Sequence, residues 1–236
     1  MDLRPEDGEY PIFAADFTNP AAVELALSRM RDQFGARIAS VVHLVAYFDQ
    51  TGEDNPLYQK VNVDGTRNLL RALQAFEVEQ FVYASTMLVH APVKPGEHMD
   101  EDQPFDPAYI YPQSKLAAEQ AIKAEHGHIP YVILRLAGVY EEKSVIPTLA
   151  QQMARIHGRD FQGYLYAGSP LTGQSMLHKE DMIDAFRRTI DRRAALPSGT
   201  AILIGEPDAM SYDAIQDEIG YLIYMEIGRA SCRERV

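Results

Sequence analysis

Residues 80–86 read QFVYAST, a nearly continuous apolar run that ends in two hydroxyl side chains, Ser85 and Thr86. Similar apolar runs occur upstream at residues 38–46 (IASVVHLVA) and downstream at residues 130–136 (PYVILRL). Runs of this length predict strands that are buried on both faces, as in a parallel sheet. The three runs therefore predict neighbouring strands of one buried sheet.

Predicted helices separate these strands. The helices cover residues 20–33, which follow the start signal Asn19-Pro20, and residues 54–76 and 111–126. Strands that alternate with helices predict βα units around a parallel sheet, so the predicted fold class is α/β. The remaining predicted elements are a short strand at 11–16, helices near 145–157 and 179–192, a short strand at 201–204 and a final helix within 211–224.

The composition excludes several classes of protein. The chain has 236 residues and a formal net charge of -12, which argues against nucleic acid or an anionic membrane as a partner. No run approaches the ~18 apolar residues of a membrane span, and no signal peptide opens the chain. Its one cysteine, Cys232, allows no disulfide and no cysteine-based zinc site. These features predict a cytoplasmic protein without a metal, and an anionic small substrate stays compatible with them.

Tyr111 and Lys115 stand four residues apart in the string YPQSK, within a predicted helix. Residues at this spacing share one helix face. A lysine ammonium beside a tyrosine hydroxyl lowers the pKa of the tyrosine, which suits proton transfer in a hydride-transfer site. A pair on a solvated helix surface is the structural alternative.

Ser85 and Thr86 precede Tyr111 by about one strand-to-helix connection, 26 and 25 residues. A hydroxyl at this place could hold a substrate oxygen while the tyrosine moves its proton. The alternative is a pair of hydroxyls that caps the end of a strand. We interpret both as catalytic candidates.

Six strings support a family assignment: VVHLVAY (41–47), NVDGTRNLL (62–70), FVYASTMLVH (81–90), YPQSK (111–115), LRLAGVY (134–140) and LHKEDMIDA (177–185). Because these strings occur together and in this order, the chain resembles the extended short-chain dehydrogenase/reductase family. This is the NAD-dependent epimerase/dehydratase group that includes UDP-glucose 4-epimerase. The resemblance implies a Rossmann-like doubly wound parallel sheet with a small partial C-terminal substrate lobe. Ligands of such sheets bind at the carboxyl ends of the strands.

The resemblance also implies roles for individual residues. Tyr111 would be the catalytic acid/base, and Lys115 would lower its pKa and bind the nicotinamide ribose. Thr86 would contact the substrate hydroxyl, with Ser85 near the nicotinamide. Besides Ser85, Tyr111 and Lys115, the implied cofactor contacts are Asp2, Asp16, Phe17, Leu44, Val45, Ala46, Asn62, Leu136 and Val139.

Two of these contacts have a structural alternative, and two family features are missing. Asp16 could be a turn acid, and Asn62 could hydrogen-bond backbone within its helix. The Gly-rich turn that places pyrophosphate at a helix N-terminus does not occur, so we expect that the chain lacks its first βα unit. Asp2 would then be the acid that holds the adenosine ribose, which favours NAD over NADP. Gly138 stands near the place of a sugar-contacting asparagine, which leaves the substrate open.

The predicted organisation has three parts. Residues 1–140 form a partial NAD-binding domain, and residues 141–226 form a partial substrate lobe from which 179–204 return to the sheet. Residues 227–236 (IGRASCRERV) are expected to be a non-native tail, because one reading frame of a common sequencing adapter encodes the whole string. An ordinary basic tail is the alternative.

The predicted function is an NAD-dependent epimerase/dehydratase that acts on a nucleotide sugar by transient hydride transfer. One alternative is an NAD(P)-dependent oxidoreductase of a small alcohol or ketone, and another is a non-catalytic dinucleotide sensor. The resemblance further implies a homodimer formed through the helices that contain residues 54–76 and 111–126.

Overall fold

The computed structural model describes residues 10–49, 53–94, 96–141, 150, 154, 165–166, 171–207, 209–219 and 225–226. Contacts within the chain divide it into two units. The first unit comprises residues 1–91, 101–136 and 184–203, and the second comprises 92–100, 137–183 and 204–236. No helix among the described residues has both the length and the apolar character needed to cross a membrane.

The apolar runs of the first unit form the central sheet. Its strand order is β10-β5-β4-β2, with β2 at Val41–His43, β4 at Phe81–Thr86, β5 at Tyr131–Leu136 and β10 at Thr200–Ile204. Strand β4 pairs in parallel with both β2 and β5. A second parallel pair joins β1 (Arg37–Ile38) to β3 (Glu77–Val78). The predicted α/β class with a parallel sheet is confirmed.

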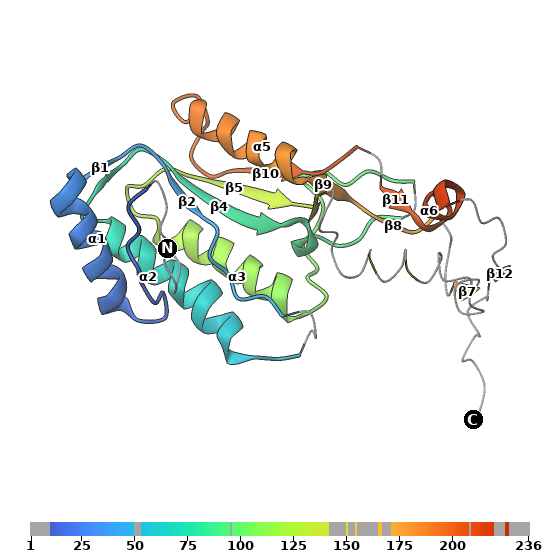
Figure 1. The fold of residues 1–236 in the computed structure, drawn as a ribbon, viewed down its shortest axis with the longest axis horizontal. Coiled ribbons are helices and arrows are strands. Elements are labelled where there is room, and N and C mark those ends of the chain that lie inside the picture. The colour runs from blue at the N-terminus through green and yellow to red at the C-terminus, as the bar shows by residue number, and fades with distance from the viewer. Residues whose placement is uncertain are drawn as a thin grey trace. The chain divides into compact units, whose positions relative to one another are not determined.

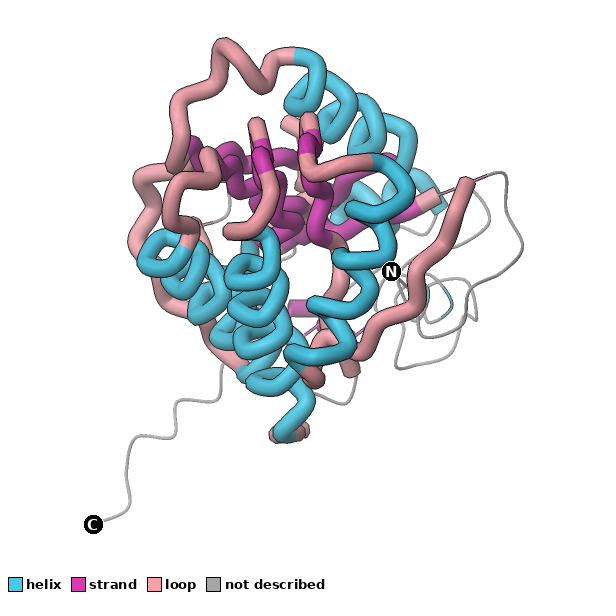
Figure 2. The backbone as a smooth tube through the Cα atoms, turned by 90° about the vertical axis from the view of Figure 1, so that its left-hand side faces the viewer, coloured by secondary structure: helices cyan, strands magenta, loops and turns pink. Residues whose placement is uncertain are grey.

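Helices cover both faces of this sheet. Helix α1 (Pro20–Phe34), helix α2 (Gly65–Leu73) and helix α3 (Ile110–Glu125) lie on one face, and α5 (Lys179–Asp191) lies on the other (Figure 1). Figure 2 shows the same layers end-on, with the strands between the helices. The arrangement is that of a doubly wound sheet, in which two helix layers bury the apolar strands.

Local sequence explains where α1 begins and ends. The side chain of Asn19 accepts a hydrogen bond from the backbone N–H of Ala21, and Pro20 occupies the first turn, where no N–H is needed. The helix ends at Gly35, whose φ of 87° lies in the region that favours glycine. The observed bounds, Pro20–Phe34, match the predicted helix closely.

The core lies between the sheet and the three helices on its first face. It includes Leu70 and Leu73 of α2, Ile122 of α3, and Phe81 and Tyr83 of β4, all essentially excluded from solvent. Burial of such side chains stabilises a fold by about 1.5–3 kcal/mol each. This packing fixes α3 against β4, and these two elements carry most of the predicted site.

Several elements differ from their predicted bounds. Residues 11–16 pair with no strand in the described part of the chain, and a strand needs a partner as well as an apolar pattern. The predicted strand 38–46 is replaced by two short strands, β1 and β2. Residues 58–64, within the predicted helix 54–76, form a π-helix that leads into α2. Most of the predicted helix 145–157, and all of the tail 227–236, lie outside the described residues.

The second unit contains short strand pairs. Strand β6 (Gly138–Tyr140) runs parallel to β9 (Met176–His178), and β8 (Gly173–Gln174) runs antiparallel to β11 (Met210–Ser211). Strand β7 (Leu165–Tyr166) pairs in parallel with β12 (Met225–Glu226). Helix α6 spans Tyr212–Ile219. The predicted domain boundaries stay predictions.

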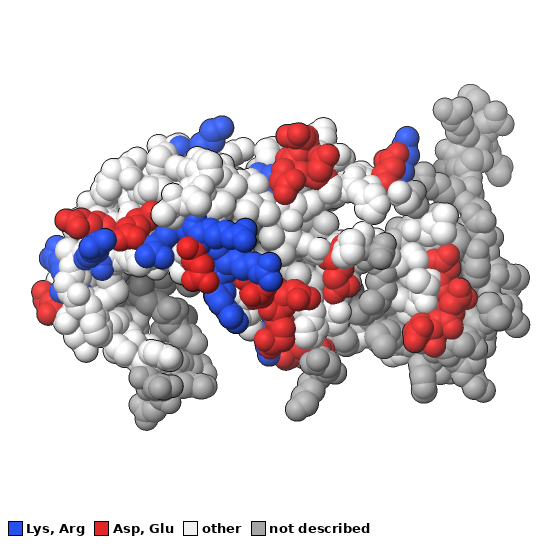
Figure 3. Space-filling model, turned by 90° about the horizontal axis from the view of Figure 1, so that it is seen from above, with Lys and Arg blue, Asp and Glu red and all other residues white. Residues whose placement is uncertain are grey.

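Basic side chains gather on one part of the surface and stand beside acidic ones (Figure 3). Arg188 of α5 pairs with Asp184 at 2.6 Å, and Arg193 and Arg37 both pair with Glu79, at 2.9 and 2.8 Å. These two arginines, with burial opposing them, lower the pKa of the Glu79 carboxyl. Each of these cations therefore has a carboxylate partner.

Candidate active site

Tyr111 and Lys115 occupy the first turns of α3, on the side that faces the sheet. Lys115 is only 2% exposed, and its Nζ lies 4.3 Å from the ring centroid of Tyr83 on β4. Burial lowers the pKa of Lys115 to about 8, against a smaller opposing effect of Glu119. A buried ammonium over an aromatic ring is stabilised by a cation–π interaction. The ring face is not a conventional hydrogen-bond acceptor for the three N–H groups of Lys115.

The environment of Lys115 suits a ligand that carries hydroxyl groups. Among the described residues, the hydroxyl of Tyr83 is a buried polar atom without a hydrogen-bond partner, and Lys115 Nζ lies over the ring that carries it. Unpaired buried polar groups are rare and costly in native proteins. Ribose hydroxyls would supply acceptors to Lys115, so the donors at this place fit a nicotinamide ribose.

The ring of Tyr111 lies among other aromatic rings. Its centroid is 4.8 Å from that of Phe48 and 6.5 Å from that of Tyr58. Burial, followed by the effects of Tyr109 and Tyr58, raises the pKa of Tyr111 to about 12. The sequence predicts the opposite direction. The difference arises because the Lys115 ammonium lies against Tyr83, so that desolvation of the phenolate dominates.

Ser85 and Thr86 end β4, and both side chains are more than nine-tenths buried. Thr86 stands opposite Leu136 in the β4–β5 register. The Thr86 hydroxyl accepts a hydrogen bond from the backbone N–H of Leu88 at 3.3 Å and so caps the short 3₁₀ helix Met87–Val89. The Ser85 hydroxyl donates to Oε1 of Glu119 at 2.5 Å. The structure therefore brings Ser85 into contact with α3.

Behind Ser85 lies a buried cluster of charged groups, which we call the charged network. Arg135 of β5 donates to both carboxylate oxygens of Glu119, at 3.2 and 2.8 Å. Its third nitrogen donates to Nε2 of His90 at 3.0 Å, and its guanidinium lies 4.8 Å from the ring centroid of Phe105. His90 Nδ1 in turn donates to the carbonyl of Gln103 at 2.6 Å. Each nitrogen of the Arg135 guanidinium and each oxygen of the Glu119 carboxylate therefore has a partner in this cluster.

A second buried cluster, the neutral network, connects β2 to the helices. His43 donates through Nε2 to the hydroxyl of Thr66 at 2.9 Å, because the single proton of Thr66 goes to the carbonyl of Asn62 at 2.6 Å. Burial lowers the pKa of His43 to about 3, with the positive charge of Lys115 as a second cause. His43 is therefore neutral at physiological pH.

Asn62 continues the neutral network toward Tyr111. Its side chain accepts from the N–H of Tyr47 at 2.6 Å and donates to the carbonyl of the same residue at 3.1 Å. It also donates to the hydroxyl of Ser114 at 2.8 Å, which donates to the carbonyl of Tyr111 at 2.7 Å. Asn62 thus fixes the loop after β2 relative to the first turn of α3.

The other predicted cofactor residues are distributed more widely. The Asp16 carboxylate accepts from the N–H and the hydroxyl of Thr18, and the ring of Phe17 stacks on His43. Residues 44–46 follow β2 without regular secondary structure, and Leu44 is exposed.

Three further predicted contacts lie in different parts of the chain. Leu136 ends β5, beside Thr86. Val139 lies on β6 in the second unit, and Asp2 lies outside the described residues. The structure thus gathers Tyr111, Lys115, Ser85, Thr86 and Asn62, together with Leu136, around the carboxyl end of β4.

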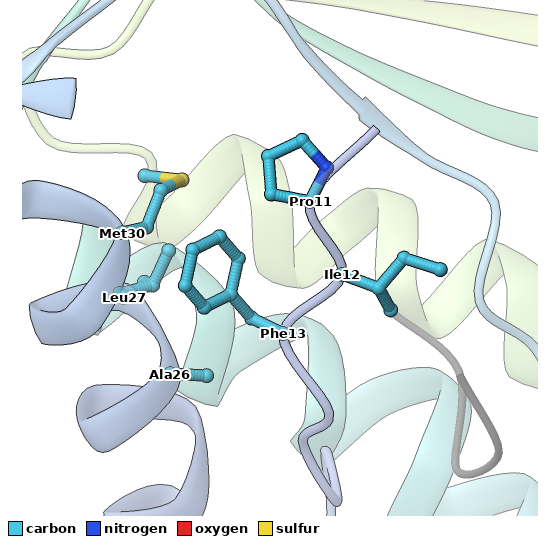
Figure 4. Close-up of a pocket in the computed structure, with 6 residues that line it drawn as sticks. All are labelled: Pro11, Ile12, Phe13, Ala26, Leu27 and Met30. Carbon is cyan, nitrogen blue, oxygen red and sulfur yellow. The ribbon is translucent and has the colours of Figure 1, made fainter. Parts of the chain in front are cut away.

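An apolar pocket of about 200 Å³ lies elsewhere in the first unit. Residues 11–13 line one side, and Ala26, Leu27 and Met30 of α1 line the other (Figure 4). The ring of Phe13 points toward α1. The pocket is below the usual volume of ligand sites, about 300–1,000 Å³, and none of the predicted catalytic residues lines it.

Sequence reasoning missed Glu119, Arg135 and His90. A signal existed for Glu119, because it stands four residues after Lys115 and eight after Tyr111, on the same helix face. Arg135 interrupts an otherwise apolar strand, which indicates a buried charge that needs a partner. Nothing local to His90 indicates its contact with Arg135, since the two residues are 45 positions apart.

The chain is similar to several known proteins. The family model described as the NAD dependent epimerase/dehydratase family matches residues 4–205. Sterol-4-alpha-carboxylate 3-dehydrogenase of Schizosaccharomyces pombe is 30% identical over 136 residues, which is 56% of this chain and 38% of the relative. An N-acetyl-alpha-D-glucosaminyl-diphospho-ditrans,octacis-undecaprenol 4-epimerase of Escherichia coli O157:H7 is 31% identical over 117 residues, 48% of this chain and 35% of the relative.

A solved structure shows the same fold. The UDP-glucose 4-epimerase of Thermus thermophilus in complex with NAD superposes with a TM-score of 0.66 at 23% identity, over 89% of this chain and 68% of that one. Of the two curated relatives named above, the chain spans little more than a third of their length. The enzyme class and the cofactor predicted from the sequence, NAD, are those of the matching family. The chain belongs to the NAD-dependent epimerase/dehydratase family.

Proposed function

We propose that this chain carries the proton-transfer site of an NAD-dependent epimerase or dehydratase that acts on a nucleotide sugar. One observation carries the proposal: Lys115, one helical turn after Tyr111 on α3, lies over the ring of Tyr83 on β4, two residues before Ser85. Glu119 of the same helix accepts a hydrogen bond from the Ser85 hydroxyl. An acid/base, a cation and hydroxyl groups in one place suit oxidation of an alcohol and reduction of the resulting ketone.

Each of these residues has its own role near the substrate oxygen. Bound NAD would accept a hydride from the substrate carbon. Tyr111 Oη takes the proton from the hydroxyl on that carbon, and the Thr86 hydroxyl donates a hydrogen bond to the oxygen that remains. In an epimerase Tyr111 would return the proton to the same substrate oxygen, so that the overall reaction would leave NAD unchanged. Lys115 holds the ribose and keeps a positive charge near Tyr111.

Tyr111 needs a lower pKa than its value in this structure to act near neutral pH. Its pKa is raised to about 12, mainly by burial. A hydroxyl-bearing ligand that draws the Lys115 ammonium from the Tyr83 ring, and the positive charge of the oxidised nicotinamide, would both favour the phenolate. We expect tyrosinate absorbance to titrate at lower pH with NAD than without it, and this difference to vanish in Tyr111→Phe.

Turnover of UDP-glucose in the presence of NAD tests the proposal. We expect UDP-galactose to form without a net change at the nicotinamide absorbance band. Tyr111→Phe serves as the inactive control, and Tyr10→Phe, an exposed change away from the site, serves as the matched control. Binding of NADH without conversion of any nucleotide sugar would argue against this substrate class. Absence of NADH binding, also from a version of the chain that carries a Gly-rich strand–turn–helix unit in front of it, would argue against the function as a whole.

A net oxidoreductase of a small or sterol-like alcohol is the second candidate. Phe48, which is 56% exposed and lies against Tyr111, offers an apolar surface at the site, and the similarity to a sterol dehydrogenase points the same way. Such an enzyme would consume NAD in proportion to its substrate. A dinucleotide sensor is a third possibility, and biological activity that survives Tyr111→Phe would favour it.

We also propose a homodimer and a cytoplasmic location, with no nucleic-acid or membrane partner. The net charge of -12 supports the last point. Sedimentation of the purified chain tests the dimer, because a monomer at micromolar concentration would contradict it.

A further inference from the structure

The hydroxyl of Ser85 has a fixed hydrogen-bond direction. It lies 2.5 Å from Oε1 of Glu119, whose carboxylate is paired with Arg135 at 2.8 Å and can only accept hydrogen bonds. The single Ser85 proton must therefore point at Glu119. What Ser85 presents in any other direction is a lone pair.

Glu119 cannot readily turn away from Ser85. Both of its oxygens accept from Arg135, and Arg135 is held in turn by His90 and by the ring of Phe105. His90 Nε2 must accept from Arg135, because Nδ1 donates to the carbonyl of Gln103. The side chains of Glu119 and Arg135 are only 5% and 7% exposed, so water does not compete for these bonds.

The hydroxyl of Thr86 has the opposite hydrogen-bond direction. Its oxygen accepts from the N–H of Leu88, and no residue in the described part of the chain accepts its proton. Two adjacent hydroxyls therefore end β4 with different roles, because Ser85 can accept from a ligand whereas Thr86 can donate to one.

We propose that Glu119 and Arg135 are positioning residues that fix Ser85 as a hydrogen-bond acceptor toward the bound ligand. The proposal rests on the proposed function, which places cofactor and substrate at this end of β4. The ligand group against Ser85 is an N–H or O–H donor, from the carboxamide of the nicotinamide or from a substrate hydroxyl. The oxygen that gains negative charge during reaction belongs at Thr86 and Tyr111.

Stability alone does not require this ion pair. Replacement of a buried ion pair by apolar side chains of similar volume is often neutral or stabilising, whereas removal of one partner is strongly destabilising. The double variant Glu119→Leu/Arg135→Met is therefore expected to fold, and it frees the Ser85 hydroxyl to rotate. The matched control is Arg67→Met/Glu125→Leu, which removes a partly exposed ion pair between α2 and α3.

The first measurement needs no ligand. Proton NMR of the chain at low temperature is expected to show one slowly exchanging hydroxyl resonance that disappears in Ser85→Ala and in Glu119→Leu/Arg135→Met but persists in the control. Absence of such a resonance from the unmodified chain, or its persistence in Glu119→Leu/Arg135→Met, would overturn the proposal. This measurement stands even if the chain fails to bind NADH, so it separates the proposal from the proposed function.

The second measurement distinguishes the two ligand sources. NADH and its reduced 3-acetylpyridine analogue, which lacks the carboxamide N–H, are titrated by fluorescence. If the carboxamide is the donor, NADH binds about tenfold more tightly than the analogue, and this preference vanishes in Ser85→Ala and in Glu119→Leu/Arg135→Met.

If a substrate hydroxyl is the donor, both dinucleotides bind alike, and kcat/KM for UDP-glucose falls about tenfold in the same two variants. Unchanged behaviour of either variant in both assays, while the unmodified chain binds NADH, would refute a positioning role. The thermal stability of the double variant shows whether a loss comes from unfolding instead.

Discussion

The charged and the neutral networks both reach α3, but one fixes a side-chain hydroxyl and the other fixes backbone groups. The neutral network, through Asn62 and Ser114, holds backbone: the loop at Tyr47 and the carbonyl of Tyr111. The charged network holds one side chain, the hydroxyl of Ser85. Uncharged groups thus fix backbone geometry in one network, and in the other a carboxylate, which can only accept hydrogen bonds, orients the proton of Ser85.

The largest expected effect is on Tyr111, whose backbone carbonyl the neutral network holds. Tyr111→Phe removes the proton donor and acceptor but leaves the carbonyl that Ser114 binds, so the fold should persist. We expect kcat to fall by about 10²–10⁴-fold with little change in NADH affinity. Steady-state kinetics and NADH titration check this prediction, and nearly full activity in the variant would remove Tyr111 from the proposed role.

The next effect tests the charged network. Arg135→Met leaves the carboxylate of Glu119 buried with Ser85 as its remaining partner, and we expect a loss of about 3–5 kcal/mol in the free energy of unfolding. Urea denaturation measures it. The control is Arg67→Met, whose ion pair is partly exposed and should contribute about 1 kcal/mol or less. Equal losses in the two variants would mean that Arg135 is not held in a dry environment.

Acid should act on the neutral network. The pKa of His43 is lowered from 6.5 to about 3, so between these values the unfolded chain binds more protons than the native one. The stability contributed by neutral His43 is present above pH 6.5 and is lost as the pH falls toward 3, by about 1.4 kcal/mol for each pKa unit. Denaturation at several pH values checks this, and His43→Gln should flatten the curve. An unchanged slope in that variant would assign the effect to other groups.

The smallest of these effects concerns the uncharged bonds of the neutral network. Asn62→Ala leaves the N–H and carbonyl of Tyr47 without their partner, which we expect to reduce the free energy of unfolding by about 1–3 kcal/mol. Asn68→Ala, which removes one partly exposed bond to the carbonyl of Phe17, is the control and should have a smaller effect. If Asn62→Ala destabilised more than Arg135→Met, the distinction between the networks would fail.

Much of the fold followed from local pattern. The apolar runs located β2, β4 and β5, and Asn19-Pro20 located the start of α1, because a strand buried on both faces must be apolar throughout and a helix start needs a cap. Residues 11–16 show the limit of such reasoning. Their composition suits a strand, but no described strand lies beside them to accept their hydrogen bonds.

The site was predictable where its residues belong to one element. Helical spacing alone placed Tyr111 and Lys115 on one face, and a strand end placed Ser85 and Thr86 together. The direction of the Tyr111 pKa was not predictable, since it depends on the burial of the ring by Phe48 and Tyr58 and on the position of the Lys115 ammonium.

The sequence by itself determined the α/β class and the family, and it predicted which residues are candidates for proton transfer, because these depend on periodicity and on residue type. Only the tertiary structure decided which groups are buried together: Glu119 with Arg135, and His43 with Thr66. The physical reason is that hydrogen bonding and desolvation depend on distances between segments far apart in the chain. Those distances set the polarity of Ser85, the pKa of Lys115 and the neutrality of His43.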